Sequence, residues 1–241
     1  MNDIFARTRL VLGNEALERL AASRVAVFGL GGVGGYAAEA LARSGIGALD
    51  IIDRDTVNPS NLNRQIIALR STVGRYKTDV MAERIKDINP DCRVTAHRTF
   101  FLPENADSFD FSGYDFIADA VDTVTAKLEI IARARAAGKP VISCMGTGGK
   151  TDPSMLEIAD IYDTAVCPLA RVMRSECRKR GIDHLTVVYS KEVPVRSGLT
   201  DPESGKPVPG STAFVPPSAG LLIAGHIVRY ICGRQPVTDS E

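Results

Sequence analysis

Four glycines mark the part of the sequence that could bind a phosphate. Gly29, Gly31 and Gly34 stand in a G-x-G-x-x-G frame, with Gly32 inside it, between a strand-like and a helix-like segment. Glycine lets the chain turn sharply and lets a phosphate approach the backbone N–H groups at the positive end of a helix. Asp53 follows Gly34 by 19 positions, where a carboxylate can accept hydrogen bonds from ribose hydroxyls. The pattern fits NAD as well as any other adenosine nucleotide, and the alternative is tight strand–helix packing without a ligand.

A second polar segment, DRDTVNPSNLNRQ, begins at Asp53 and favours a triphosphate. Asn61, Arg64 and Gln65 supply amide and guanidinium donors, and Lys77 adds an ammonium group at the start of the next expected helix. Arg64 and Lys77 together can neutralise a triphosphate and stabilise charge that develops on the α-phosphate during attack. A hydride-transfer site needs no such concentration of positive charge, so the sequence favours ATP over NAD.

Asp122 closes a strand expected over residues 114–122 and is a candidate Mg²⁺ ligand, because this ion prefers oxygen ligands and usually keeps several waters. Each residue alone has an ordinary explanation. Asp53 or Asp122 could cap a helix, Arg64 could be a surface cation and Lys77 a solvated residue of a first helical turn. Their order along one expected sheet edge favours a functional site.

The bulk composition limits the classes of protein. Lys+Arg and Asp+Glu are balanced at 29 each, so a nucleic acid or a membrane would have to be met by a local patch. No apolar run is long enough to cross a bilayer, and no signal peptide is recognisable. The five cysteines form no CxxC pair, which favours a reducing, cytoplasmic location and argues against a disulfide framework or a structural zinc site. They are Cys92, Cys144, Cys167, Cys177 and Cys232.

The elements that would position these residues follow from hydrophobic periodicity and from Gly and Pro stops. Strands are expected over 24–29, 48–53, 92–97, 114–122 and 139–146, and helices over 14–22, 32–44, 77–89 and 125–138. We expect Asn14 to cap the first helix. This alternation predicts an α/β fold with a mostly parallel sheet and helices on both faces. In such sheets ligands bind beyond the carboxyl ends of the strands, where the candidate residues lie.

The second half of the chain is less regular. Residues 146–154 read as a flexible loop, and residues 196–211 are rich in Gly, Pro and Ser, which indicates mobility. Strands are expected over 155–162 and 185–190, and helices over 167–181 and 217–232. We expect one domain over residues 1–241. Its nucleotide-binding core would be 1–146, and 147–241 would form a smaller C-terminal α/β extension for substrate and dimer contacts.

The helix expected over 167–181 is basic. Arg171, Arg174 and Arg178 fall at i, i+3 and i+7 on one helical face, with Lys179 and Arg180 adjoining. Such a face could bind RNA phosphates. The alternative is an ordinary solvated helix face.

The glycine loop, DRDTVNPSNLNRQ and Lys77 resemble the adenylating domain of the ubiquitin-activating-enzyme-like (ThiF/MoeB/HesA) superfamily, which has a Rossmann-like fold. Within it, ALARSGIGALDIID, GTGGKTDPS and PLARVMRSECRKRGI resemble the family of tRNA threonylcarbamoyladenosine dehydratases, and this similarity runs nearly the full length. The resemblance implies ATP-dependent dehydration and cyclisation of threonylcarbamoyladenosine in tRNA through an acyl-adenylate intermediate.

The resemblance also implies residue roles. The glycine loop and Asp53 would hold the adenosine, and Asp122 would bind Mg²⁺. Arg9 matches an N-terminal arginine that reaches the partner subunit's phosphates, which requires a homodimer. The implied ATP contacts are Gly29, Gly31, Gly32, Gly34, Asp53, Asp55, Asn61, Arg64, Gln65, Lys77 and Asp122, and the implied catalytic residues are Arg9, Arg64, Lys77 and Asp122.

Two departures and several alternatives accompany the resemblance. The paired CxxC motifs of sulfur-carrier activators are missing, and the loop PGSTAFVPP contains no cysteine, so no thioester-forming cysteine is expected and Cys167 and Cys177 read as structural. The alternative functions are an adenylyltransferase for a ubiquitin-like sulfur-carrier protein, an NAD-binding oxidoreductase and a nucleotide-sensing module. A monovalent cation in residues 146–154 and a cysteine desulfurase or sulfur-acceptor partner stay open.

Overall fold

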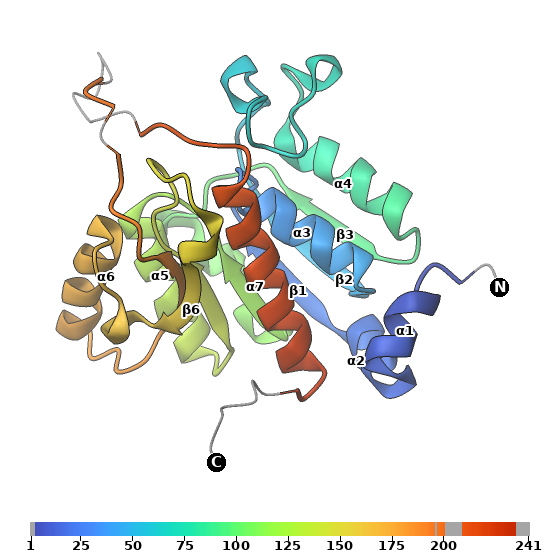
Figure 1. The fold of residues 1–241 in the computed structure, drawn as a ribbon. Coiled ribbons are helices and arrows are strands. Elements are labelled where there is room, and N and C mark those ends of the chain that lie inside the picture. The colour runs from blue at the N-terminus through green and yellow to red at the C-terminus, as the bar shows by residue number, and fades with distance from the viewer. Residues whose placement is uncertain (1–2, 196, 201–208, 235–241) are drawn as a thin grey trace.

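A computed structural model describes residues 3–195, 197–200 and 209–234. Seven strands form one sheet in the order β3-β2-β1-β4-β5-β7-β6 (Figure 1). All neighbouring pairs are parallel except β6 and β7, which are antiparallel. The strands are β1 (Arg24–Phe28), β2 (Ala48–Ile52), β3 (Arg93–His97), β4 (Phe116–Asp119), β5 (Val141–Cys144), β6 (Leu156–Asp160) and β7 (Thr186–Ser190). The expected mostly parallel α/β sheet is therefore confirmed.

Helices cover both faces of the sheet. Val25 and Val27 of β1 pack into one apolar core with α3, α4 and α7, whereas the alternate residues Ala26 and Phe28 enter a second core on the opposite face. Successive side chains of a strand point to opposite faces. Figure 1 shows α3, α4 and α7 in front of the sheet. The helices are α1 (Ala6–Leu12), α2 (Asn14–Ala22), α3 (Gly34–Arg43), α4 (Lys77–Ile88), α5 (Val124–Ala136), α6 (Pro168–Lys179) and α7 (Val215–Ile231).

The C-terminal part of the chain extends the same sheet. β7 pairs with β5, and β6 forms the edge beyond it. α7 packs along α3 so closely that a Cβ at Gly220 would lie 2.3 Å from the carbonyl oxygen of Val33. The C-terminal extension therefore shares its sheet and one core with the nucleotide-binding half, and the division at residue 146 stays a functional interpretation.

Several local predictions were wrong for identifiable reasons. Gly13, not Asn14, caps α2, because the cap residue has φ +87°, which favours glycine. β4 ends at Asp119 and not at Asp122, because the Asp119 carboxylate accepts a hydrogen bond from the backbone N–H of Val121 and turns the chain. The short helix α1 had not been predicted.

Two further predictions concern mobility and membrane association. Of the segment 196–211, predicted to be mobile, residues 196 and 201–208 lie outside the described residues. Among the helices of the described part of the chain, none has the length and apolar character needed to span a membrane.

Candidate active site

The glycine loop lies at the carboxyl end of β1, and two of its glycines are required by packing. Gly29 has φ +88°, and a Cβ there would lie 2.7 Å from the carbonyl oxygen of Ala120. A Cβ at Gly34 would lie 1.8 Å from the carbonyl oxygen of Gly29. Any side chain at either position would push the loop away from β4 and from the start of α3. These two glycines therefore hold the turn in its tight form.

The other two glycines face the polar segment that follows β2. Among the described residues, a Cβ at Gly31 would have one neighbour within 4 Å, the Gln65 side-chain nitrogen at 3.9 Å. A Cβ at Gly32 would lie 3.3 Å from Cγ of Arg64. The structure thus brings Arg64 and Gln65 to the glycine loop, as the sequence predicts. The space beside Gly31 is the open side of the loop.

Gln65 is buried, and its side-chain oxygen Oε1 has no hydrogen-bond partner among the described residues. Buried polar atoms are nearly always paired, so this acceptor marks a place where a ligand donor or a water would be accommodated. Arg64 is half-buried and donates to the carbonyl oxygen of Ser60 and to Oδ1 of Asn63, both at 2.9 Å. Asn61 uses its Oδ1 to accept from the backbone of Asn58.

Asp53 ties the glycine loop to the next strand. Its Oδ2 accepts from the backbone N–H of Leu30 at 2.7 Å, and its Oδ1 accepts from that of Asp55 at 2.8 Å. Each carboxylate oxygen has two lone pairs, so both oxygens can still accept from ribose hydroxyls. Asp53 therefore fixes the loop and keeps lone pairs that can accept further hydrogen bonds.

Lys77 is the first residue of α4 and is buried. Its ammonium group donates to Oδ2 of Asp55 at 2.8 Å and lies 3.6 Å from Oδ2 of Asp53. The Asp55 side chain is 48% exposed, whereas that of Lys77 is only 7% exposed. The positive charge is thus held at the edge of the sheet by a carboxylate that can move away into solvent.

Asp122 lies three residues beyond β4 and is exposed. The turn that carries Asp122 is held by Asp119, whose carboxylate accepts a hydrogen bond from the backbone N–H of Val121 at 3.2 Å. From the other side, the turn packs against the glycine loop through Ala120. Asp122 is therefore at the edge of the sheet, but it is not part of strand β4.

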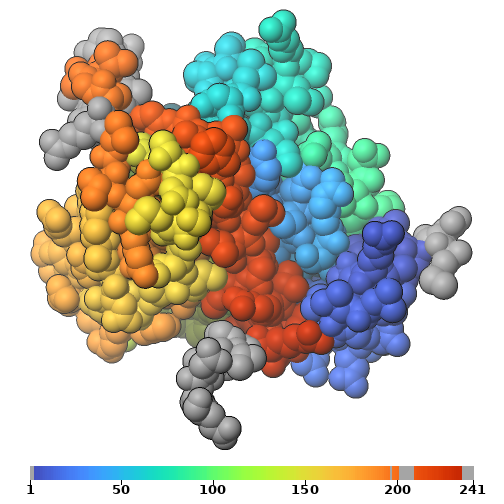
Figure 2. All heavy atoms as spheres, viewed as in Figure 1, coloured from blue at the N-terminus to red at the C-terminus, as the bar shows by residue number. Residues whose placement is uncertain are grey.

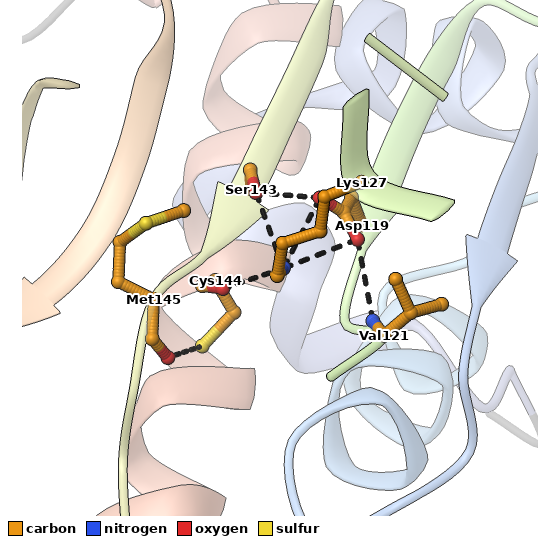
Figure 3. Close-up of polar contacts among 6 residues, drawn as sticks. All are labelled: Asp119, Val121, Lys127, Ser143, Cys144 and Met145. Atoms are coloured by element: carbon orange, nitrogen blue, oxygen red, sulfur yellow. Dashed lines mark hydrogen bonds and ion pairs between the residues drawn. The ribbon is translucent and has the colours of Figure 1, made fainter. Parts of the chain in front are cut away.

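A buried polar cluster beneath this turn was missed by sequence reasoning (Figure 3). The ammonium group of Lys127, in α5, donates to the carbonyl oxygen of Cys144 at 2.7 Å and lies 3.2 Å from Oδ2 of Asp119. Ser143 donates to the same Asp119 oxygen at 2.5 Å. Lys127, Asp119 and Ser143 are fully buried. The cluster joins the carboxyl ends of β4 and β5 and positions the loops that leave them.

Arg9 is not brought to this site. It lies on α1, where it pairs with the carboxylate of Asp3. Phe5, next to α1, packs 3.5 Å from the Cβ position of Gly45, just past the end of α3, whereas Gly34 begins α3. Figure 1 shows α1 at the opposite end of the molecule from the loop after β2. Arg9 is therefore remote from the nucleotide loop of its own chain.

The basic face of α6 is largely engaged within the chain. Arg174 donates to the carbonyl oxygen of Thr164 at 2.8 Å, and the Arg178 guanidinium lies 5.1 Å from the ring centroid of Tyr162. Lys179 and Arg180 both pair with Glu176. Arg171 is exposed and pairs with no carboxylate among the described residues. Arg174 and Arg178 thus contact the carbonyl oxygen of Thr164 and the ring of Tyr162, and no carboxylate among the described residues pairs with any of the three arginines.

The cysteines lie mostly in the interior. Burial raises the pKa of the Cys144 thiol to about 12 and that of Cys92 to about 11, so both stay protonated near neutral pH. Cys167 precedes α6 and is buried against Gly146. No disulfide joins cysteines of the described chain, and its His, Cys, Asp and Glu residues form no group of three that could hold a metal ion.

Comparisons with known proteins agree along nearly the whole chain. The family model described as ThiF family matches residues 5–240. The tRNA threonylcarbamoyladenosine dehydratase of Bacillus subtilis is 44% identical over 235 residues, which cover 93% of this chain and 92% of that protein. A crystal structure of Escherichia coli tRNA N6-threonylcarbamoyladenosine dehydratase with ATP superposes with a TM-score of 0.87 at 36% identity, covering 95% and 94% of the two chains. The complex of that enzyme with AMP gives 0.86 at 36% identity over the same shares.

Proposed function

Because this chain belongs to the ThiF family, we propose that it is an ATP-dependent enzyme that dehydrates and cyclises threonylcarbamoyladenosine in tRNA through an acyl-adenylate. The observation that carries this proposal is the likeness of the whole chain, including its second half, to a protein of that name. The alternative, activation of a sulfur-carrier protein, has no comparable support in the C-terminal extension. A hydride-transfer reaction would leave the cationic groups at the sheet edge without a role.

The residues at the carboxyl edge fit ATP. The open side of the glycine loop is at Gly31, where the side-chain nitrogen of Gln65 can donate to a phosphate. The buried oxygen of the same side chain, which has no partner among the described residues, can accept from a ribose hydroxyl or a water. In this proposal the loop and Asp53 hold the adenosine, while Asn61, Arg64 and Gln65 contact phosphates. Asn61 can offer its amide nitrogen, because its oxygen is already used in the adjacent turn.

Lys77 would exchange partners when the nucleotide binds. The charge of Lys77 is balanced by Asp55 at 2.8 Å, whose side chain is half exposed, and by the buried carboxylate of Asp53 at 3.6 Å. The triphosphate chain as a whole carries more negative charge than one carboxylate, and Asp55 can be rehydrated when it leaves. Lys77 and Arg64 would then stabilise the charge that develops on the α-phosphate.

The proposed reaction needs no nucleophile from the enzyme. The threonyl carboxylate oxygen attacks the α-phosphorus, and the bond to pyrophosphate breaks. The carbamoyl group then attacks the activated carboxyl carbon, AMP leaves with the former carboxylate oxygen, and the carbamoyl proton passes to solvent. The net result is loss of water from the nucleoside. Ring closure is intramolecular, and well-placed groups can reach effective molarities of about 10⁵ M or more, so positioning carries much of the catalysis.

Asp122 would hold Mg²⁺ together with the phosphates. One carboxylate suffices, since Mg²⁺ keeps several waters and is often bound by one or two carboxylates plus substrate phosphates. The exposed position of Asp122 leaves room for those waters. The bound ion would neutralise phosphate charge. A monovalent cation in residues 146–154 stays a hypothesis; the ammonium group of Lys150 in that loop donates to the carbonyl oxygen of Ser190 at 3.1 Å.

A homodimer would complete the site with Arg9. Because Arg9 lies far from the glycine loop of its own chain, it could act only in a neighbouring copy. Leu10 and Val11 on the same helix are 87% and 70% exposed, which is unfavourable unless another surface covers them. In a two-fold dimer each chain would offer α1 to the partner's site.

We place this enzyme in the cytoplasm, with tRNA as its substrate. A sulfur-relay partner stays a hypothesis.

Mass spectrometry of tRNA nucleosides tests the proposal. Purified protein is incubated with ATP, Mg²⁺ and tRNA that carries threonylcarbamoyladenosine. We expect that nucleoside to lose the mass of one water, with release of pyrophosphate and AMP. Unchanged nucleosides, with pyrophosphate released only when a carrier protein with a Gly-Gly tail is supplied, would instead assign the chain to carrier activation.

A further inference from the structure

Two arginine–aromatic pairs lie on the surface beside the candidate active site. The guanidinium carbon of Arg54 is 3.7 Å from the ring centroid of Phe100, and that of Arg98 is 4.9 Å from the ring centroid of Tyr76. Phe100 is 40% exposed and Tyr76 is 43% exposed. We call these four residues the stacking surface. None of them has a role in the nucleotide site described above.

The stacking surface is tied directly to that site. Arg54 follows Asp53, and Tyr76 precedes Lys77, so two of its residues are chain neighbours of proposed ATP contacts. Backbone hydrogen bonds join the segments, from Asp53 N–H to the carbonyl oxygen of His97 and from Lys77 N–H to that of Asp55. Residues 54–76, cyan to teal in Figure 2, protrude at the upper end of the molecule. The surface is therefore held rigidly next to the proposed reaction centre.

The charge of this surface suits a polyanion. Arg98 shares its charge with Asp79 through two hydrogen bonds of 2.8 Å, but Arg54 has no carboxylate partner among the described residues. Phe100 and Tyr76 are also exposed, so a base can reach their side chains from solvent. Rings and guanidinium planes left exposed next to one another are the groups on which unpaired bases stack.

We propose that the stacking surface binds unpaired bases of the tRNA loop that flank the modified adenosine. This inference rests on the proposed function. A nucleoside that reacts at the sheet edge must leave the base stack of its loop, and its neighbours lose stacking partners when it does. Phe100 and Tyr76 replace those partners, and Arg54 adds a cation near the loop backbone. Stacking tolerates different bases, so this contact serves tRNAs whose loops differ in sequence.

The basic face of α6 fits this role less well. Arg174 donates to Thr164, and the ring beside Arg178 belongs to Tyr162, which is half-buried, whereas Phe100 and Tyr76 are exposed. Long-range attraction of tRNA by α6 remains compatible with base contacts at the stacking surface, because phosphate contacts orient an RNA and base contacts hold its loop.

Leucine and tryptophan variants test the proposal. Phe100→Leu and Tyr76→Leu keep an apolar side chain but remove the ring, whereas Phe100→Trp retains it. Tyr230→Leu is the matched control, because Tyr230 is 55% exposed and lines a cavity at the other end of the sheet, beside the first residues of β5 and β7. The probe is an anticodon stem-loop that carries threonylcarbamoyladenosine, and its dissociation constant is measured at several salt concentrations.

We expect each leucine variant to weaken stem-loop binding about tenfold at every salt concentration, because the lost contact is stacking and not charge. Phe100→Trp and Tyr230→Leu should bind as the unaltered protein does, and ATP affinity should be unchanged in all four. Arg54→Gln should reduce the dependence of binding on salt.

Three results would overturn the inference. They are unchanged stem-loop affinity in both leucine variants, an equal loss of ATP affinity, and dissociation into monomers in sedimentation experiments, which would make this surface an interface between copies. Failure of the proposed function would look different, since the unaltered protein itself would then leave the modified nucleoside intact.

Discussion

Two lysine–carboxylate pairs lie near the glycine loop and differ in the exposure of the carboxylate. We interpret one pair as part of the proposed ligand site and the other as a structural pair that stabilises the fold. Lys77 pairs with Asp55 at 2.8 Å, and Lys127 lies 3.2 Å from Asp119. Both lysines belong to the first turn of a helix that follows a strand. The Asp55 side chain is half exposed, however, whereas the Asp119 side chain is completely buried.

The exposure of the carboxylate decides what each lysine can do. Removal of Asp55 from Lys77 costs little, because the carboxylate regains water while a phosphate can take its place. Removal of Asp119 from Lys127 would leave a charge without water or a counterion. A lysine close to the glycine loop is therefore not necessarily a ligand contact. A lysine whose carboxylate partner is exposed can exchange that partner for a phosphate, whereas a lysine whose partner is buried cannot.

The largest expected effect is a loss of unfolding free energy when the buried Lys127–Asp119 pair is broken. Lys127→Met leaves Asp119 buried and unpaired, and we expect unfolding free energy to fall by about 3–5 kcal/mol. Urea unfolding measures this loss. Lys77→Met is the control and should lose only about 1 kcal/mol, because half-exposed Asp55 is rehydrated. The buried carboxylate of Asp53, 3.6 Å from Lys77, keeps its hydrogen bonds from the backbone N–H groups of Leu30 and Asp55. Equal losses in the two variants would show that the two pairs do not differ as described.

The next effect is on activity, at the open pair. Lys77→Ala and Arg64→Ala should each slow adenylate formation about 10²-fold or more, because each removes a charge that stabilises the transition state. Pyrophosphate release with modified tRNA reports the rate, and circular dichroism checks that the fold is retained. Near-normal rates in both variants would remove these residues from the active site.

Apart from α1, the order of strands and helices in the first half could be predicted from the sequence, and so could the convergence of the glycine loop, Asp53 and Lys77. These features rest on local patterns and on the rule that parallel strands end on one edge. The resemblance to the ThiF family, drawn from the same motifs, is confirmed.

The buried cluster could not be predicted in the same way. Asp119, Lys127 and Ser143 belong to β4, α5 and β5, so only the packed topology brings them together. The sequence did contain one indication of a buried polar cluster. Asp119 and Ser143 stand inside apolar strands, and a buried polar residue requires a partner. The place of β7 between β5 and β6 likewise depends on long-range pairing.

A third carboxylate, that of Asp50, makes the unfolding free energy depend on pH. Asp50 is buried in β2. Burial alone would raise its pKa, but hydrogen bonds from His97 and Arg24 hold the pKa of Asp50 below its usual range. A lowered folded-state pKa contributes stability above the unfolded value, near 3.9, and loses it as the pH falls further.

Asp50→Asn should therefore reduce unfolding free energy at pH 7 by about 2 kcal/mol, through loss of charge-assisted hydrogen bonds. The difference from the unaltered protein should narrow as the pH falls from 4 to 2. Urea unfolding at a series of pH values measures it. A difference that stays constant over that range would mean that the ionised form of Asp50 does not contribute.

The smallest expected effect concerns Asp122. Asp122→Asn should raise the Mg²⁺ concentration needed for half-maximal pyrophosphate release on the order of tenfold, because the phosphates and waters remain as ligands. Stability should not change, since Asp122 is exposed. Magnesium titrations with and without saturating ATP separate metal binding from nucleotide binding. An unchanged Mg²⁺ requirement would remove Asp122 as a ligand.

A crystal structure of this protein with ATP and Mg²⁺ tests the central contrast most directly. We expect the ammonium group of Lys77 to leave Asp55 and to lie within hydrogen-bond distance of a phosphate oxygen, with Arg64 beside it, while Lys127 stays on Asp119. A bound nucleotide with Lys77 still on Asp55, and with both cations remote from every phosphorus atom, would contradict it.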